Sequence, residues 1–194
     1  MEYKFENKIV GDFVDLRKIT ISDAEDVYSW RKSESGKYLR HPENYTLKTQ
    51  KEWIKNITES EINYIIYSKD HNNKVGMIGI YDINRIDKIA NVGRLFLSDD
   101  NLKKSNPYGL ESLLLAYDIV FNKMKFRKIT GDILGLNDNM IKLQKFLGMK
   151  QEGYLEKHVY IKNNYQDLII MSLFEKDFKV YKNRVNMLLK SFRK

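Results

Sequence analysis

The sequence lacks cysteine altogether, which excludes disulfide bonds, a thiol nucleophile and thiolate zinc sites. Its three histidines, His41, His71 and His158, are scattered, and none has metal-ligand spacing from another, so no metal is expected. No apolar run approaches the ~20 residues of a membrane-spanning helix, and the charged first residues differ from a secretory signal peptide. We therefore expect a cytoplasmic protein without a membrane partner.

Proline and linker-like sequence are also scarce. Only Pro42 and Pro107 occur, and neither a Gly/Ser-rich segment nor an internal repeat divides the 194 residues. The net charge of +8 is concentrated at the C-terminal end, because residues 176–194 hold seven Lys and Arg against Asp177 and so contribute +6. The remaining chain is close to neutral, which argues against nucleic acid as a partner. We expect one domain over residues 1–175 and a basic, helical tail over residues 176–194.

Hydrophobic periodicity predicts an α/β fold. Helical spacing indicates a helix that opens at Ser22, and further helices at about 49–57, 108–123 and 140–147. Alternating or apolar runs bounded by turn residues indicate strands at 13–19, 62–67, 75–83, 89–97, 128–134, 150–160 and 168–174. This order predicts a mixed, mostly antiparallel central sheet of about seven strands with flanking helices, followed by a C-terminal basic helix.

Four weak motifs follow one another at characteristic spacings. They are Ala90-Asn-Val-Gly-Arg-Leu-Phe-Leu97 with Lys104-Ser-Asn-Pro-Tyr-Gly109, Asn137-Asp-Asn-Met140, Gly148-Met149 with Glu152-Gly153, and Asn164-Tyr-Gln-Asp167. Together, over about residues 12–175, they resemble the GNAT superfamily of N-acetyltransferases, especially the branch with ribosomal-protein N-terminal acetyltransferases. The resemblance implies an acyltransferase that uses acetyl-CoA as co-substrate.

The resemblance also implies where the coenzyme binds. A helix N-terminus offers unpaired N–H groups and about half a positive charge to a pyrophosphate, and Gly109 lets the backbone approach it closely. Pro107 departs from the family motif, because it replaces a glycine and has no amide hydrogen. The side chain of Asn137 could instead cap the next helix, and residues 95–97 could be core. The residues expected to contact the coenzyme are Leu95, Phe96, Leu97, Lys103, Lys104, Ser105, Asn106, Tyr108, Gly109, Leu110 and Asn137.

The two catalytic groups that many relatives use are missing. The position of the relatives' glutamate is Asn91, and that of their tyrosine is Gln144. The candidates that remain are Asp82, at a strand end, and His158, whose intrinsic pKa suits a base; either could simply be a surface residue. Gly93 is expected to mark a β-bulge, where an exposed amide could stabilise an oxyanion by about 3–4 kcal/mol.

A Trp30-Arg31 pair lies at the end of the first predicted helix, and Gln50 and Trp53 lie three residues apart in the second. This helix–loop–helix resembles relatives that act on nucleotide-activated amino sugars, which have a Trp-Arg pair followed by Gln/His-x-x-Trp. Cations here could bind a diphosphate, and Tyr38 or Tyr45 could stack on a base. We therefore expect a small-molecule primary amine as acceptor, with the amino-sugar nucleotide as the first hypothesis. The residues expected to bind it are Trp30, Arg31, Lys37, Tyr38, Arg40 and Tyr81.

Several alternatives stay open. A protein N-terminus or an aminoglycoside would also fit the fold, whereas a polyamine is disfavoured because the segment is basic. A non-catalytic acetyl-CoA-binding protein, or a nucleic-acid-binding module that uses the tail, would belong to another functional class. A homodimer is compatible with the sequence.

Overall fold

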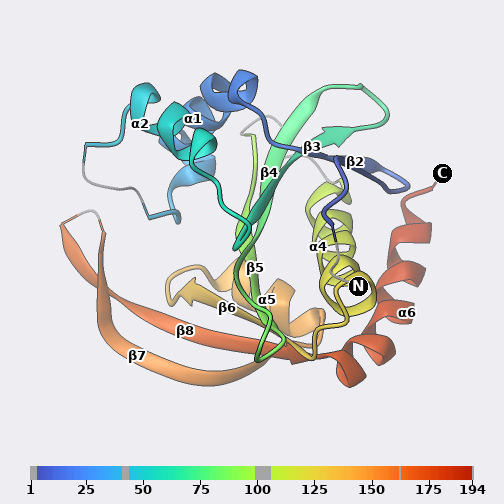
Figure 1. The fold of residues 1–194 in the computed structure, drawn as a ribbon. Helices are drawn as coiled ribbons and strands as arrows, with labels where there is room; N and C mark the ends of the chain where they lie inside the picture. Colours follow the sequence, from blue (N-terminus) through green and yellow to red (C-terminus); the bar gives the residue numbers. More distant parts are fainter. Residues whose placement is uncertain (1–3, 41–43, 99–105, 162, 194) are drawn as a thin grey trace.

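The computed structural model describes residues 4–40, 44–98, 106–161 and 163–193. An eight-stranded sheet runs through the molecule in the order β1-β2-β3-β4-β5-β6-β8-β7 (Figure 1). All neighbouring strands are antiparallel except β5 and β6, which are parallel. The predicted mixed, mostly antiparallel sheet is therefore confirmed. Its strands are β1 (Lys8–Val10), β2 (Val14–Lys18), β3 (Ile62–Ser68), β4 (Lys74–Asn84), β5 (Ile89–Leu97), β6 (Lys128–Leu134), β7 (Lys150–Ile161) and β8 (Asn164–Phe174).

The sheet has one strand more than the sequence predicts. The additional strand is β1, which pairs with β2 at the edge of the sheet. With only three residues, of which Ile9 alone is buried, β1 is too short to show a periodic pattern.

Helices cover both faces of the sheet. In Figure 1, α1 and α2 lie together on one side of the molecule, and α4 and α6 lie on the other. The segment predicted as one helix over 108–123 consists of an α-helix followed by a π-helical turn. The helices are η1 (Ile21–Asp23), α1 (Ala24–Lys32), η2 (Glu34–Gly36), α2 (Leu47–Lys55), α4 (Tyr108–Asp118), η3 (Ile119–Lys123), α5 (Asp138–Phe146) and α6 (Glu175–Ser191).

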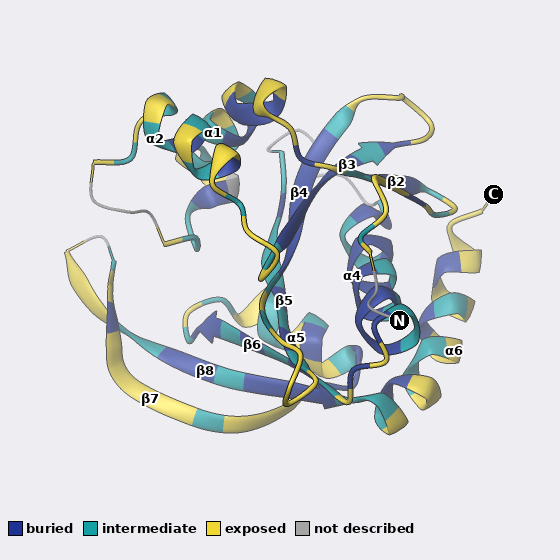
Figure 2. Ribbon diagram, in the orientation of Figure 1, coloured by how far each residue is buried: buried dark blue, intermediate teal, exposed yellow. Residues whose placement is uncertain are grey.

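The described residues form three hydrophobic clusters, and β3 contributes to two of them. Tyr64 and Ile66 of β3 join the core beneath α4 and α6, whereas Ile65 joins the smaller core beneath α1 and α2. Because both faces are covered, β3 is almost continuously apolar rather than alternating. Figure 2 shows the consequence, in which the central strands are largely buried and β7, at the sheet edge, is mostly exposed.

A buried carboxylate fixes the start of α4 on the sheet. Glu111, which is 3% exposed, accepts hydrogen bonds from the backbone N–H groups of Asp12, Phe13 and Val14, each at 2.7 Å. Three charge-assisted hydrogen bonds compensate the cost of burying the charge. They join the first turn of α4 to the β1–β2 connection.

The predicted C-terminal helix is present as α6. Phe178, Val185 and Leu189 on its inner face are buried in the larger core. The ring of Phe178 lies 5.0 Å from that of Phe121 and 6.1 Å from that of Tyr117, measured between centroids. The basic residues of α6 therefore lie on a helix that packs against the rest of the domain.

Candidate active site

The central feature of the site is the parting of β5 from β6. The two strands pair only at Ile89↔Lys128, Ala90↔Ile129 and Asn91↔Thr130. The rest of β5 pairs with β4 alone within the described chain. A cavity of about 390 Å³ is lined by the parted strands, by α5 and by the segment after η2.

A β-bulge in β5 faces this cavity. The pairs Met77↔Phe96 and Gly79↔Gly93 span two steps in β4 and three in β5, so β5 holds one extra residue. The predicted bulge is therefore present, but the residue with left-handed backbone is Arg94, at φ 53°. Gly93 serves another purpose, because a Cβ there would lie 2.8 Å from the hydroxyl oxygen of Tyr81.

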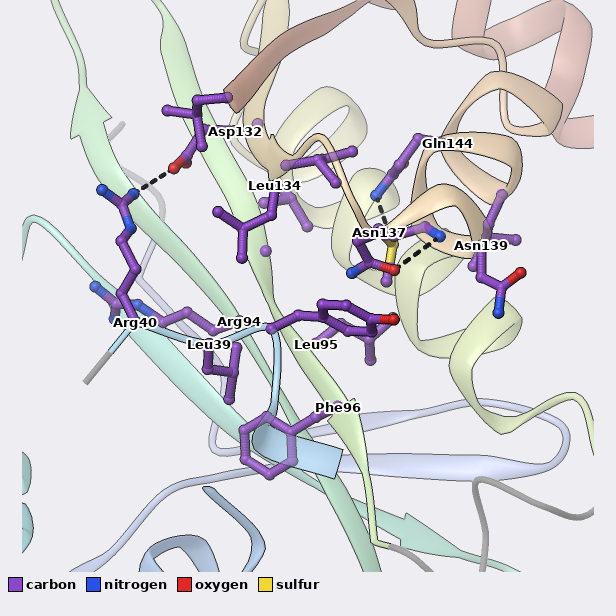
Figure 3. Close-up of a pocket in the computed structure, with 18 of the residues that line it drawn as sticks. Leu39, Arg40, Arg94, Leu95, Phe96, Asp132, Leu134, Asn137, Asn139 and Gln144 are labelled. Atoms are coloured by element: carbon purple, nitrogen blue, oxygen red, sulfur yellow. Dashed lines mark hydrogen bonds and ion pairs between the residues drawn. The ribbon is translucent and has the colours of Figure 1, made fainter. Parts of the chain in front are cut away.

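Charged residues gather at one end of the cavity. Arg40 forms an ion pair with Asp132 of β6 (Figure 3). Tyr81 lines the same end, and burial, followed by the charge of Asp132, raises the pKa of its hydroxyl. The guanidinium of Arg94 lies 4.2 Å from the centroid of the Tyr81 ring and binds Glu61 and Asn63.

The opposite end of the cavity is formed by α5, whose residues Asn137, Asn139 and Gln144 are labelled in Figure 3. The side chain of Asn137 caps α5 by accepting from the Met140 N–H at 3.3 Å, and Asn137 also lines the cavity. Gln144 is buried, and its Oε1 accepts a hydrogen bond from the hydroxyl of Tyr117. This bond directs the amide nitrogen of Gln144 away from Tyr117.

The expected coenzyme loop leads into α4. Asn106 accepts a hydrogen bond from the Tyr108 N–H at 3.1 Å, and Pro107 is the N-cap residue. The Tyr108 side chain points away to Asp70, whose carboxylate oxygens lie 2.6 and 2.7 Å from the hydroxyl. A Cβ on Gly109 would lie 3.8 Å from Leu97 and 3.9 Å from Leu95, so the helix start meets β5. The predicted contacts Lys103, Lys104 and Ser105 lie outside the described residues.

A second cavity, of about 910 Å³, adjoins the first. The two share the wall formed by Glu34, Lys37, Leu39 and Arg40. Its other basic residues are Arg31, Lys32 and His158, and Tyr45 lies below Arg31 with 5.4 Å between the guanidinium carbon and the ring centroid. The lining carries four Lys or Arg side chains against one carboxylate, Glu34, which pairs with Lys37.

The comparisons with known proteins agree with this geometry. A family model described as "Acetyltransferase (GNAT) domain" matches residues 14–150. The chain belongs to the GNAT acetyltransferase family. It is therefore an acetyl-CoA-dependent acyltransferase.

Individual GNAT relatives are distant. The SPbeta prophage-derived uncharacterized N-acetyltransferase YokL of Bacillus subtilis (strain 168) is 25% identical over 162 residues, which are 84% of this chain and 87% of that protein. A GCN5-related N-acetyltransferase from Brucella melitensis has a TM-score of 0.80 at 15% identity and covers 96% of this chain and 87% of its own. A spermidine N-acetyltransferase SpeG chimera from Vibrio cholerae and hSSAT has a TM-score of 0.78 at 19% identity. The match covers 87% of this chain and 99% of that one. At these identities the solved structures establish the fold.

Within this GNAT fold, the expected catalytic candidates lie outside the first cavity. Asp82 is exposed and accepts a hydrogen bond of 2.8 Å from Asn91, which in turn binds Thr130. His158 is exposed and lines only the second cavity among those found in the described chain.

Most of the expected acceptor residues are brought together. Lys37, Tyr38, Arg40 and Tyr81 line the first cavity, and Arg31 lines the second. Trp30 instead packs against Phe96 in the smaller core, with 6.0 Å between ring centroids.

Three charged residues that line the first cavity, Glu34, Arg94 and Asp132, were not predicted from the sequence. Asp132 is a carboxylate in the otherwise largely apolar β6, and this contrast is the signal that could have identified it. The described residues contain no cluster of His, Asp or Glu suited to a metal ion. They also contain no helix that is both long and apolar enough to cross a membrane.

Proposed function

We propose that this acetyltransferase moves an acetyl group from acetyl-CoA to the primary amine of a small anionic acceptor, and that a nucleotide-activated amino sugar is the acceptor class. The observation that carries the proposal is the pair of adjoining cavities. One is lined by the parted strands β5 and β6, and the other is lined by an excess of cations.

The first cavity suits the coenzyme arm. Beyond Asn91, the edge of β5 that leaves β6 can pair with the amide groups of pantetheine, much as an added strand would. Acetyl-CoA supplies the acetyl thioester when it is bound. Its contacts would come from Leu95 and Phe96 on β5 and from Asn137, which line this cavity, and from Leu97, which lies nearer the start of α4. The bulge at Gly93 would present an amide to the thioester oxygen.

The pyrophosphate would lie at the start of α4, where Asn106, Tyr108, Gly109 and Leu110 are the proposed contacts, with Lys103, Lys104 and Ser105. Two features weaken this end as an anion site. Pro107 has no amide hydrogen, and the side chain of Asn106 already accepts from the Tyr108 N–H. A phosphate oxygen that replaced Asn106 would restore the hydrogen bond and add the attraction of the helix dipole.

The second cavity suits an anionic acceptor. Arg31, Lys32 and Arg40 give it positive charge, and Lys37 adds a cation whose partner is the exposed Glu34. A diphosphate would be attracted here, and the ring of Tyr45, which also lines this cavity, could stack on a base. A polyamine would be repelled by the same charges.

A thiol-release assay tests the proposal. With acetyl-CoA fixed, kcat/KM is compared for a UDP-linked amino sugar, an aminoglycoside, a peptide with a free N-terminus and spermidine. The UDP-linked amino sugar is expected to give the highest value. A higher value for spermidine would contradict the acceptor class, and tight acetyl-CoA binding without thiol release from any amine would contradict acetyl transfer. Mass spectrometry of small molecules that co-purify with the protein would identify the acceptor class independently.

A further inference from the structure

Asp132 is a carboxylate on β6 whose side chain lines the first cavity. Along β6 it shares a face with Thr130 and Leu134, beyond the last residue that pairs with β5. Its side chain is only 22% exposed and lines the first cavity at the end opposite α5 (Figure 3). A carboxylate at an interior strand position is costly unless it has a partner or a function.

The partner of Asp132 is more than half exposed. Arg40 donates from Nη2 to Asp132 Oδ2, while its own side chain is 56% exposed. The carbonyl oxygen of Arg40 accepts from Arg31 Nη2 at 2.7 Å, which holds the Arg40 backbone against the second cavity. An ion pair this accessible contributes little stability, so another anion can compete for the guanidinium.

Asp132 also lies near the β5 bulge. The Tyr81 hydroxyl is packed against Gly93, and the charge of Asp132 acts on that hydroxyl. The other charged groups around Tyr81 are Asp82, Arg94 and Arg40. Of these, Arg94 is already paired with Glu61, and Asp82 lies outside the cavity.

We infer that Asp132 is the general base of acetyl transfer, and that Arg40 covers it until an anionic group on the acceptor draws the guanidinium away. The inference rests on the proposed function. Arg40 lines both cavities. A small rotation of its side chain therefore moves the guanidinium from the Asp132 carboxylate to a phosphate of the acceptor. The acceptor's ammonium then takes the place of the guanidinium beside Asp132.

The proton balance is simple. Asp132 accepts one proton from the ammonium, and the amine nitrogen bonds to the carbonyl carbon of the thioester. The C–S bond breaks, and the second proton of the nitrogen passes to the departing thiolate, directly or through water. Asp132 returns its proton to solvent after the amide product leaves. The exchange must come first because the paired guanidinium otherwise occupies the carboxylate oxygen that the ammonium has to reach.

A binding cycle with UDP tests the exchange without requiring catalysis. Calorimetry is performed on the wild type, Arg40→Ala, Asp132→Asn and the double variant. Arg40→Ala should weaken UDP binding by about tenfold, as expected for a lost charge-assisted contact. Asp132→Asn should tighten it about threefold, because Arg40 is released, and this gain should vanish in the double variant.

Arg193 and Asp12 form the matched control, because they are also an exposed Arg–Asp pair and line none of the cavities found in the described chain. Arg193→Ala and Asp12→Asn should leave UDP binding unchanged. Failure of UDP to bind the wild type would overturn the exchange. An equal gain from Asp132→Asn with and without Arg40 would overturn it as well, because simple charge removal would then suffice.

Kinetics test the base. Asp132→Asn should lower kcat at least 100-fold with the best acceptor of the panel and remove the acidic limb of the kcat–pH profile, whereas Asp132→Glu should restore part of both. Full activity of Asp132→Asn with an unchanged profile would overturn the assignment. If the wild type releases no thiol with any amine, the proposed function and the base fail together, while the binding cycle still decides whether Arg40 exchanges partners.

Discussion

The two ends of the first cavity are held in different ways. The α5 end is fixed by a buried hydrogen bond from Tyr117 to Gln144 and by a partly buried one from the Met140 N–H to Asn137. The opposite end is held by ion pairs with an exposed partner, Arg40 with Asp132 and Lys37 with Glu34. Buried hydrogen bonds are costly to break, whereas exposed ion pairs exchange easily. We infer that the α5 end, which is the proposed coenzyme end, is rigid and that the opposite end, which is the proposed acceptor end, is adaptable.

The largest effect is expected where α4 joins the sheet on the coenzyme side. Glu111→Gln should lower the free energy of unfolding by about 2–4 kcal/mol, because three backbone N–H groups lose a charged acceptor and one of them faces an amide donor. Chemical denaturation measures the loss. The control is Glu25→Gln, which removes the charge from a carboxylate that is 75% exposed and should change stability by less than about 0.5 kcal/mol.

Gly93→Ala tests the β5 bulge, which lines the first cavity. The new Cβ would lie 2.8 Å from the Tyr81 hydroxyl, so the bulge or the ring must move. We expect kcat/KM to fall by about 100-fold, as misplaced catalytic geometry does, with little loss of secondary structure by circular dichroism. Gly153→Ala on β7 is the comparison, because its Cβ would only reach contact distance of Ile170, at 3.4 Å. Equal activity of both variants would show that the bulge geometry is not required.

A double-mutant cycle tests the rigidity of the α5 end. Gln144→Leu should lower the free energy of unfolding by about 1–3 kcal/mol, because the buried Tyr117 hydroxyl loses its acceptor. Adding Tyr117→Phe should recover part of this loss, since the unsatisfied hydroxyl is then removed. Strictly additive losses would show that the hydrogen bond does not support this end.

The smallest effect concerns alkaline pH at the acceptor end. Burial raises the pKa of Tyr45 from 10.0 to about 12, against the opposing effect of Arg31. The unfolded chain therefore ionises at lower pH than the folded one, so stability is full below pH 10 and falls as the pH rises toward 12. Thermal melts should show a shallower decline over this window for Tyr45→Phe than for the wild type. An identical decline would mean that Tyr45 ionises as easily in the folded protein.

The sequence predicted the elements of the proposed coenzyme end far better than the contacts of the proposed acceptor end. The strand at β5, the helix at α4 and the cap at Asn137 depend on local periodicity and on motifs that are contiguous in the chain. The Arg40–Asp132 pair joins residues 92 positions apart, and no local pattern encodes such a contact. The left-handed backbone conformation of Arg94 could not be predicted either, because glycine is the residue that usually adopts it.

Two other candidates have suitable chemistry, but the fold places both outside the first cavity. His158 has the intrinsic pKa of a base but lies on the exposed strand β7. Asp82 stands at the bulged end of β4, where it binds Asn91 instead of facing the cavity. Residue type alone therefore identified possible bases. Only the tertiary structure showed which carboxylate or imidazole lines the first cavity.

The short wall of residues 34–40 separates the two cavities and contributes to both linings. Most of the residues proposed to distinguish one acceptor from another thus lie in a single stretch of chain, whereas the proposed coenzyme contacts lie on β5, on α4 and at the start of α5. Replacing residues 34–40 with the corresponding residues of a relative would change both linings in a single step. Acceptor preference could then drift in evolution, or be re-engineered, without disturbing the acetyl donor.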